Sequence, residues 1–207
     1  MISDTRRISI GVIGAGTISQ SVHLESLRRA GFDVRIVCDL SPTRANQVAM
    51  MLGAEAATDP TEVFASDVDA VLIATPGSHA QLAAAAIRAR KHVLAEKPLA
   101  FTLREVDELE QLAADAGVVT QVGYMKMFDP LLATATRELA EYRDVRLVRV
   151  TVAHPADEPQ VSHLRLGEAP RDADPEVIAA AVAYDWPALP TPCLAPTMHC
   201  SPTTRTC

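Results

Sequence analysis

The sequence predicts an α/β fold in which helices cover both faces of a doubly wound parallel sheet. The first observation is a regular alternation of short β-branched apolar runs with longer alanine- and leucine-rich stretches. The second is that the apolar runs are nearly unbroken, as in strands buried on both sides. The third is the composition, 48% hydrophobic and 22% charged over 207 residues, which is typical of a globular chain long enough to bury a core.

The expected strands and helices alternate over residues 1–123, which we expect to form one domain. The five runs with strand character are Ile8–Ile13, Val34–Cys38, Ala70–Ala74, His92–Ala95 and Val118–Val122. The four runs with helical character are Ser19–Ala30, Thr43–Leu52, Ser78–Arg90 and Thr102–Ala116. The last helix has the clearest signals, because Thr102 and Glu105 are spaced as a capping box and Gly117 is a typical helix stop.

The pattern changes after Gly123, and residues 124–185 indicate the incomplete start of a second, mixed α+β region. Leu131–Tyr142 has helical spacing, and Val145–Ala153 alternates apolar and polar residues as a half-exposed strand does. A polar, proline-bearing stretch follows, and Glu176–Tyr184 has the alanine content of a short helix.

Residues 186–207 differ in composition from everything before them. They contain the only tryptophan, three of the four cysteines and none of the 26 acidic residues. We expect this tail to be disordered, and a shifted reading frame or an artefactual C-terminus explains its composition best. The alternative is a metal site formed by Cys193, Cys200, Cys207 and His199. The six-residue gaps between these cysteines do not match a zinc knuckle, so no metal is expected.

Charge and hydropathy narrow the range of partners. The chain has 19 basic and 26 acidic residues, a formal net charge of −7 and no long basic run, so nucleic acid is not expected as a partner. The longest uncharged stretch of the main body, Ala70–Ile87, contains Pro76 and Gly77, so no membrane span is expected. Arg6 and Arg7 precede an apolar run as in a twin-arginine export signal, but the run suits a buried strand better, and we expect a cytoplasmic protein.

A glycine-rich turn follows the first expected strand and opens the first expected helix. Gly14 permits a tight turn, and Gly16 lets the backbone approach a pyrophosphate at the helix N-terminus. Thr17 and Ile18 lie in this first turn, and the third position of the glycine motif is Ser19, which is small enough for close packing of helix on strand. The motif predicts a Rossmann-type dinucleotide site, and a glycine turn without a ligand is the simpler alternative.

Asp39 ends the second expected strand, 23 residues after Gly16. A carboxylate at this position can accept hydrogen bonds from both ribose hydroxyls of an adenosine, and it repels a 2′-phosphate. We therefore expect NAD rather than NADP as the cofactor. Arg44, on the following helix, could reverse this preference by pairing with the phosphate, so NADP stays possible.

Two further loops follow expected strands, and in a doubly wound sheet the carboxyl ends of the strands face the ligand. Thr75 and Pro76 come directly after the strand that begins at Ala70, so we expect them to contact the cofactor. His79, in the same loop, either lines the site or lies on the surface of the next helix, and the sequence leaves both open.

The turn Glu96-Lys97-Pro98 directly follows the expected strand His92–Ala95. A lysine at the carboxyl end of a strand can project into a cofactor cleft, where its donors could orient a substrate hydroxyl. Glu96 could hold this lysine in place. On chemical grounds alone, an exposed Lys-Pro turn without a role accounts equally well for these residues.

Together these motifs resemble the glucose-fructose oxidoreductase, inositol dehydrogenase and rhizopine catabolism (Gfo/Idh/MocA) family. The resemblance covers about residues 7–130, and its most specific part is Lys91–Ala100, which contains Glu96-Lys97-Pro98. It implies an NAD(P)-dependent oxidoreductase that transfers a hydride to or from a sugar, cyclitol or related hydroxyl or carbonyl. It also implies that Lys97 is the active-site lysine, often preceding a cis-proline, and that Gly123–Pro130 leads into a substrate domain.

The expected cofactor contacts are Gly14, Gly16, Thr17, Ile18, Asp39, Thr75, Pro76, His79, Glu96 and Lys97. Members of the family are much longer than this chain, because a second domain floors the substrate pocket and supplies an Asp and a His for proton transfer. His154 and His163 stand in no motif that matches that histidine. The alternative function is therefore a dinucleotide-binding remnant without turnover. A homo-oligomer is possible for full-length members and is not expected here.

Other enzyme classes are disfavoured. The sequence has no Tyr-x-x-x-Lys pair, which short-chain dehydrogenases require, and no Gly-x-x-x-x-Gly-Lys-[Ser/Thr] loop, which P-loop nucleotide hydrolases require. The expected partner is thus a small polyol or sugar-like molecule beside the dinucleotide.

Overall fold

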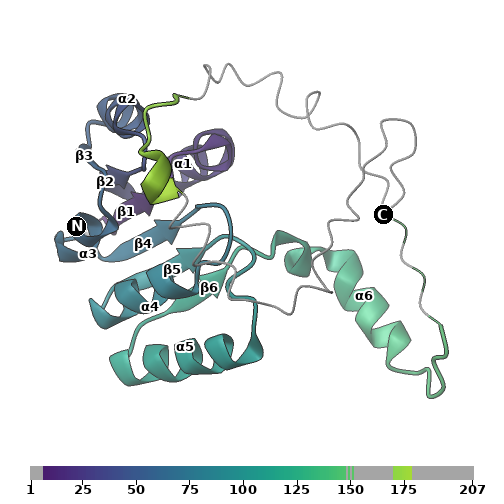
Figure 1. Cartoon of the computed structure of the whole chain (residues 1–207). Coiled ribbons are helices and arrows are strands. Elements are labelled where there is room, and N and C mark those ends of the chain that lie inside the picture. Colours follow the sequence, from purple (N-terminus) through teal and green to yellow (C-terminus); the bar gives the residue numbers. More distant parts are fainter. Residues whose placement is uncertain (1–6, 148, 150, 152–169, 179–207) are drawn as a thin grey trace, which may run out of the picture.

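The computed structural model describes residues 7–147, 149, 151 and 170–178, and a six-stranded parallel sheet lies at its centre (Figure 1). The strands are β1 (Ser9–Ile13), β2 (Asp33–Cys38), β3 (Glu55–Ala57), β4 (Ala70–Ile73), β5 (His92–Ala95) and β6 (Thr120–Val122). Their order across the sheet is β3-β2-β1-β4-β5-β6. The chain therefore builds outward from β1 to β3, returns to place β4 beside β1, and builds outward again to β6. This is the predicted Rossmann topology.

Helices cover both faces of the sheet, as predicted. They are α1 (Leu24–Arg29), α2 (Pro42–Leu52), α3 (Pro60–Ala65), α4 (Ala80–Arg88), α5 (Leu103–Ala116) and α6 (Pro130–Leu139), with a π-helical η1 (Ser19–His23) and a 3₁₀-helical η2 (Met125–Phe128). Leu27 of α1 and Val48 of α2 belong to one buried cluster. Val63 of α3, Ile87 of α4 and Leu109 of α5 belong to another. The first two helices thus pack on one face and the next three on the other.

Each inner strand contributes to both clusters, because successive side chains of a strand point to opposite faces. Val12 and Val37 pack in the cluster of α1 and α2, whereas Ile13 and Cys38, the next residues, pack in the cluster of α3 to α5. This two-sided burial explains why the apolar runs are unbroken. Burial raises the pKa of the Cys38 thiol to about 12, so this cysteine stays protonated and acts as a small apolar side chain.

The sequence did not predict β3 and α3. β3 has only three residues and no β-branched side chain, and Glu55 is exposed, so the segment has little strand propensity of its own. It becomes a strand because the edge of β2 pairs with it from Ile36 to Cys38. α3 does carry a start signal in the sequence, since Asp59 and Glu62 form a capping box around a proline at the first helical position.

The part that follows β6 has fewer regular elements. The helix expected at Leu131–Tyr142 is present as α6, with Asp129 as its N-cap. The strand expected at Val145–Ala153 is wrong for its described residues, 145–147, 149 and 151, which form no ladder with another segment. Residues 175–178 are helical, which agrees with the start of the helix expected at Glu176–Tyr184. The tail at 186–207 lies outside the described residues.

No helix in the described ranges has both the length and the apolar character needed to cross a lipid bilayer.

Candidate dinucleotide site

The glycine turn lies at the carboxyl edge of the sheet, at the point where the strand order reverses between β1 and β4. Gly14 has a φ of +91°, and a Cβ on it would be 2.7 Å from the carbonyl oxygen of Ala74. Its N–H donates to the carbonyl of Cys38 at 2.8 Å. Position 14 therefore admits only glycine. A Cβ on Gly16 would meet no atom within 4 Å, so open space lies beside this part of the turn.

Ser19, at the third position of the glycine motif, is fully buried, and its hydroxyl donates to the carbonyl of Gly14. The side-chain amide of Gln20 donates to the carbonyl of Ala15 at 2.7 Å. The helix begins as η1, in which the N–H of Leu24 reaches back five residues to Ser19. The helix expected at Ser19–Ala30 is therefore present, and its first part is π-helical. Such wide turns are frequent at functional sites.

Asp39 connects the glycine turn to the start of α2, and only 8% of it is exposed. Its Oδ2 accepts the N–H of Ala15 at 2.9 Å, and its Oδ1 accepts the N–H of Ser41 at 2.9 Å. The guanidinium of Arg44 lies 3.3 Å from Oδ1. A carboxylate has about four lone-pair positions. Asp39 can thus hold the turn and still accept a further hydrogen bond, and Arg44 is already paired with an anion.

His79 connects the loop after β4 to the turn after β5. It is only 1% exposed, which rules out the surface position that the sequence left open. Its Nδ1 lies 2.6 Å from the carbonyl oxygen of Pro98, and its Nε2 lies 2.8 Å from that of Thr75. Its backbone N–H donates to the carbonyl of Leu99 at 3.0 Å. Both ring nitrogens thus face carbonyls of the two loops. Pro76, the next residue after Thr75, is exposed.

Lys97 is exposed at the end of β5, and the peptide bond between it and Pro98 is cis, as the family resemblance implied. Glu96 holds the backbone of this lysine rather than its ammonium, because Oε2 accepts the Lys97 N–H at 3.1 Å. The other oxygen, Oε1, lies 2.8 Å from Nε2 of His23 in η1. No pattern in the sequence singles out His23, since a histidine in a helix carries no sign of a carboxylate 73 positions later.

The parallel sheet brings the predicted residues to one edge. Gly14, Asp39, Thr75 and Lys97 follow β1, β2, β4 and β5, and parallel strands place their carboxyl ends together. Gly123, after β6, packs on the carboxylate of Glu96, because a Cβ there would be 3.3 Å from Oε1. This edge combines a turn with open space at Gly16, a buried carboxylate and an exposed lysine. Thr17 and Ile18 lie on its surface.

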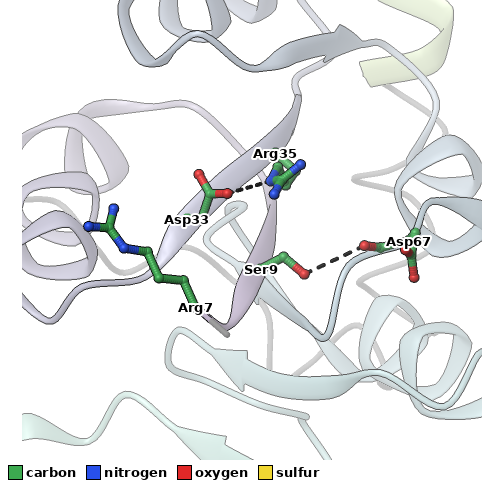
Figure 2. Close-up of a pocket in the computed structure, with 5 residues that line it drawn as sticks. All are labelled: Arg7, Ser9, Asp33, Arg35 and Asp67. Atoms are coloured by element: carbon green, nitrogen blue, oxygen red, sulfur yellow. Dashed lines mark hydrogen bonds and ion pairs between the residues drawn. The ribbon is translucent and has the colours of Figure 1, made fainter. Parts of the chain in front are cut away.

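A separate pocket lies at the opposite, amino-terminal edge of the sheet (Figure 2). It is lined by Arg7, Ser9, Asp33, Arg35 and Asp67. Ser9 and Asp33 are the first residues of β1 and β2, so this pocket is far along the strands from the glycine turn. Arg35 pairs with Asp33 in this pocket, and the Ser9 hydroxyl donates to the backbone carbonyl of Asp67 at 3.5 Å. Within the described residues no group of three metal-ligating side chains occurs.

Comparison with known proteins agrees with this geometry. Residues 8–124 match the model of the Gfo/Idh/MocA oxidoreductase family with its NAD-binding Rossmann fold. An inositol 2-dehydrogenase of Mycolicibacterium smegmatis is 39% identical over 135 residues, which are 62% of this chain and 38% of that protein. The chain thus spans about two fifths of the length of this relative.

Solved structures show the same similarity. The 3-ketoreductase KijD10 of Actinomadura kijaniata, in complex with TDP-benzene and NADP, has a TM-score of 0.59 at 29% identity, over 65% of this chain and 44% of that one. The WlbA dehydrogenase of Chromobacterium violaceum, in complex with NADH and UDP-GlcNAcA, has a TM-score of 0.60 at 25% identity, over 67% and 41%. With more than half of its residues matched by the family model, the chain belongs to the Gfo/Idh/MocA family of NAD(P)-binding oxidoreductases.

Proposed function

We propose that this chain binds NAD(H) at the carboxyl edge of its sheet and that the chemistry of this site is hydride transfer to or from a polyol or sugar-like substrate. The observation that carries the proposal is the glycine turn, which leaves open space at Gly16 and binds the carboxylate of Asp39 through the N–H of the preceding residue, Ala15. Gly16, Thr17 and Ile18 would face the pyrophosphate, and Asp39 would accept from the adenosine ribose.

The reactive half of the site would lie between the loops after β4 and β5. When bound, the nicotinamide ring supplies or accepts the hydride. The role we propose for Lys97 is to orient the reacting oxygen of the substrate through Nζ and to assist the movement of its proton. Glu96 and His79 would fix the position of this lysine, because they hold the backbone at Lys97 and Pro98 respectively. The inositol 2-dehydrogenase that the chain resembles supports a cyclitol or related substrate.

Binding of a dinucleotide without turnover is the second candidate. It is favoured by α6, in which no residue is buried, because a substrate pocket needs a second packed layer to exclude water. The two candidates make the same prediction for cofactor binding and differ only in turnover.

Substitution of Gly16 by valine tests the cofactor site. The valine should abolish NADH binding, because its side chain would fill the space that the pyrophosphate needs, and it should leave the fold intact, because a Cβ at Gly16 meets nothing. Titration of NADH fluorescence measures the binding, and circular dichroism checks the fold. Ala114→Val is the control, since it adds a valine side chain at an exposed position in the last turn of α5, before β6 and at the edge of the sheet opposite the site. Wild-type affinity in the Gly16→Val variant would assign the cofactor to another place.

A substrate screen separates the two candidates. Under the first candidate, incubation of the purified chain with NAD and a panel of inositols, sugars and their acids should reduce NAD with at least one of them. This turnover should disappear in Lys97→Ala, because that variant removes the Nζ that we propose orients the reacting oxygen, and it should persist in Lys126→Ala, another exposed lysine. A chain that binds NADH but reduces no NAD above background would establish the second candidate.

A further inference from the structure

A segment distant in sequence returns to the start of α2. Residues 170–178, the yellow-green segment beside α2 in Figure 1, place the carboxylate of Asp172 against two donors. The Ser41 hydroxyl donates to Oδ1, and the Thr43 N–H donates to Oδ2 at 2.9 Å. The contact lies 131 positions from Ser41 along the chain, so local sequence does not impose it.

These two donors form the N-terminal end of an 11-residue helix. Ser41 is the N-cap of α2, and Pro42 at the first helical position has no N–H. The first backbone N–H of the helix that is free to donate is therefore that of Thr43. The two hydrogen bonds lower the pKa of Asp172 to about 2, which keeps the carboxylate charged at any pH near neutrality. The Asp172 carboxylate thus already binds at the N-terminal end of α2, where the helix dipole is positive.

The same end belongs to the adenosine side of the proposed cofactor site. The N–H of Ser41 donates to Asp39 at 2.9 Å, while its hydroxyl donates to Asp172, so Ser41 lies between two carboxylates. Arg44, whose N–H donates to the Ser41 hydroxyl oxygen at 3.1 Å, pairs its guanidinium with Asp39. Hydroxyl, helix amide and guanidinium are the groups that recognise a phosphate monoester on a ribose.

We propose that Asp172 is a specificity-determining residue, because its carboxylate occupies the donors that the 2′-phosphate of NADP(H) would need. The proposal rests on the proposed dinucleotide site. A 2′-phosphate would compete with Asp172 for Ser41 and Thr43 and would be repelled by it and by Asp39. The ribose hydroxyls of NAD(H) are neutral and can donate to Asp39 while Asp172 stays in place. Two carboxylates, those of Asp39 and Asp172, would then disfavour NADP(H). Asp172 lies far from the glycine motif in the sequence.

Substitution of Asp172 by alanine in the full chain tests this. We expect the dissociation constant for NADPH to fall about fivefold and that for NADH to change less than about twofold, because only the phosphate gains the vacated donors. Fluorescence titration with each reduced cofactor measures both. Glu176→Ala removes an equal charge from the same segment at an exposed position and should change neither constant by more than about twofold. Asp172→Asn keeps the shape of the side chain and separates charge from occupancy.

The salt dependence gives a second readout. Because the carboxylate of Asp172 is exposed, the advantage of Asp172→Ala for NADPH should shrink as the salt rises from about 50 mM to about 500 mM. Unchanged NADPH affinity in a variant that binds NADH would overturn the assignment. An equal gain for both cofactors would also overturn it, since it would indicate a general obstruction by the segment. Failure of every variant and of the wild type to bind either cofactor would remove the proposed function itself.

Discussion

At the scale of single residues, one buried imidazole joins two loops of the site. His79 is among the largest side chains that are completely enclosed, and its ring nitrogens face the carbonyls of Thr75 and Pro98. A neutral imidazole has one N–H, so it donates to one of the two carbonyls, and the protonated ring donates to both. The position of Lys97 depends on this connection, because Pro98 follows it directly.

Replacement of His79 by alanine should lower the free energy of unfolding by about 2–4 kcal/mol, since it leaves a cavity and removes the ring that faces the half-buried carbonyls of Thr75 and Pro98. Urea denaturation at neutral pH measures the change. His92→Ala is the control, because His92 is exposed and water can replace its acceptance of the Val119 N–H. We expect less than about 1 kcal/mol there. Similar losses at both positions would show that His79 has no special structural role.

At the scale of elements, the strands and helices that bury a full apolar face were predictable. β1, β2, β4 and β5 differ from their predicted ranges by one residue or less at each end, because their apolar runs are packed from both sides. β3 was not predictable, since Glu55–Ala57 becomes a strand only beside β2. The π-helical start of the first helix was not predictable either, because its hydrogen bonds depend on contacts with the glycine turn.

The residues of the candidate site also fall into two groups, those that could be predicted from the sequence and those that could not. Gly14, Asp39 and Lys97 were predictable because each follows a strand whose carboxyl end is fixed by the topology. His23 and Asp172 were not, because their partners lie 73 and 131 positions away and no spacing links them to the motif. Sequence thus predicts the residues placed by strands and misses those placed by tertiary contacts. The cofactor contacts of all these residues remain predictions.

At the scale of the whole molecule, the two buried clusters draw on residues from Ile10 to Val122. Beyond them, large apolar side chains in η2 and α6 are exposed, with Met127 at 66%, Phe128 at 72% and Leu131 at 75%. A helix that presents an apolar stripe normally packs it on another layer. The described residues of this chain provide no such layer. These side chains therefore form an exposed apolar surface that favours aggregation.

A shortened chain that ends at Asp129 should therefore fold. It retains every residue of the two buried clusters and all six strands, so its free energy of unfolding should differ from that of the full chain by no more than about 0.5 kcal/mol, and its NADH affinity should be unchanged. It should aggregate less, because it loses the exposed apolar residues of α6. Urea denaturation, NADH titration and light scattering measure the three properties.

The shortened chain also lacks Asp172, so its affinity for NADPH should differ from that of the full chain. Its NADPH affinity should rise to that of the full-length Asp172→Ala variant, because both free the Ser41 hydroxyl and the Thr43 amide. If the shortened chain unfolds at much lower urea, residues beyond 129 support the fold through contacts that the two clusters do not include. If it is stable but still binds NADPH as weakly as the full chain, Asp39 alone excludes the phosphate, since it is the one carboxylate beside Ser41 that both chains retain.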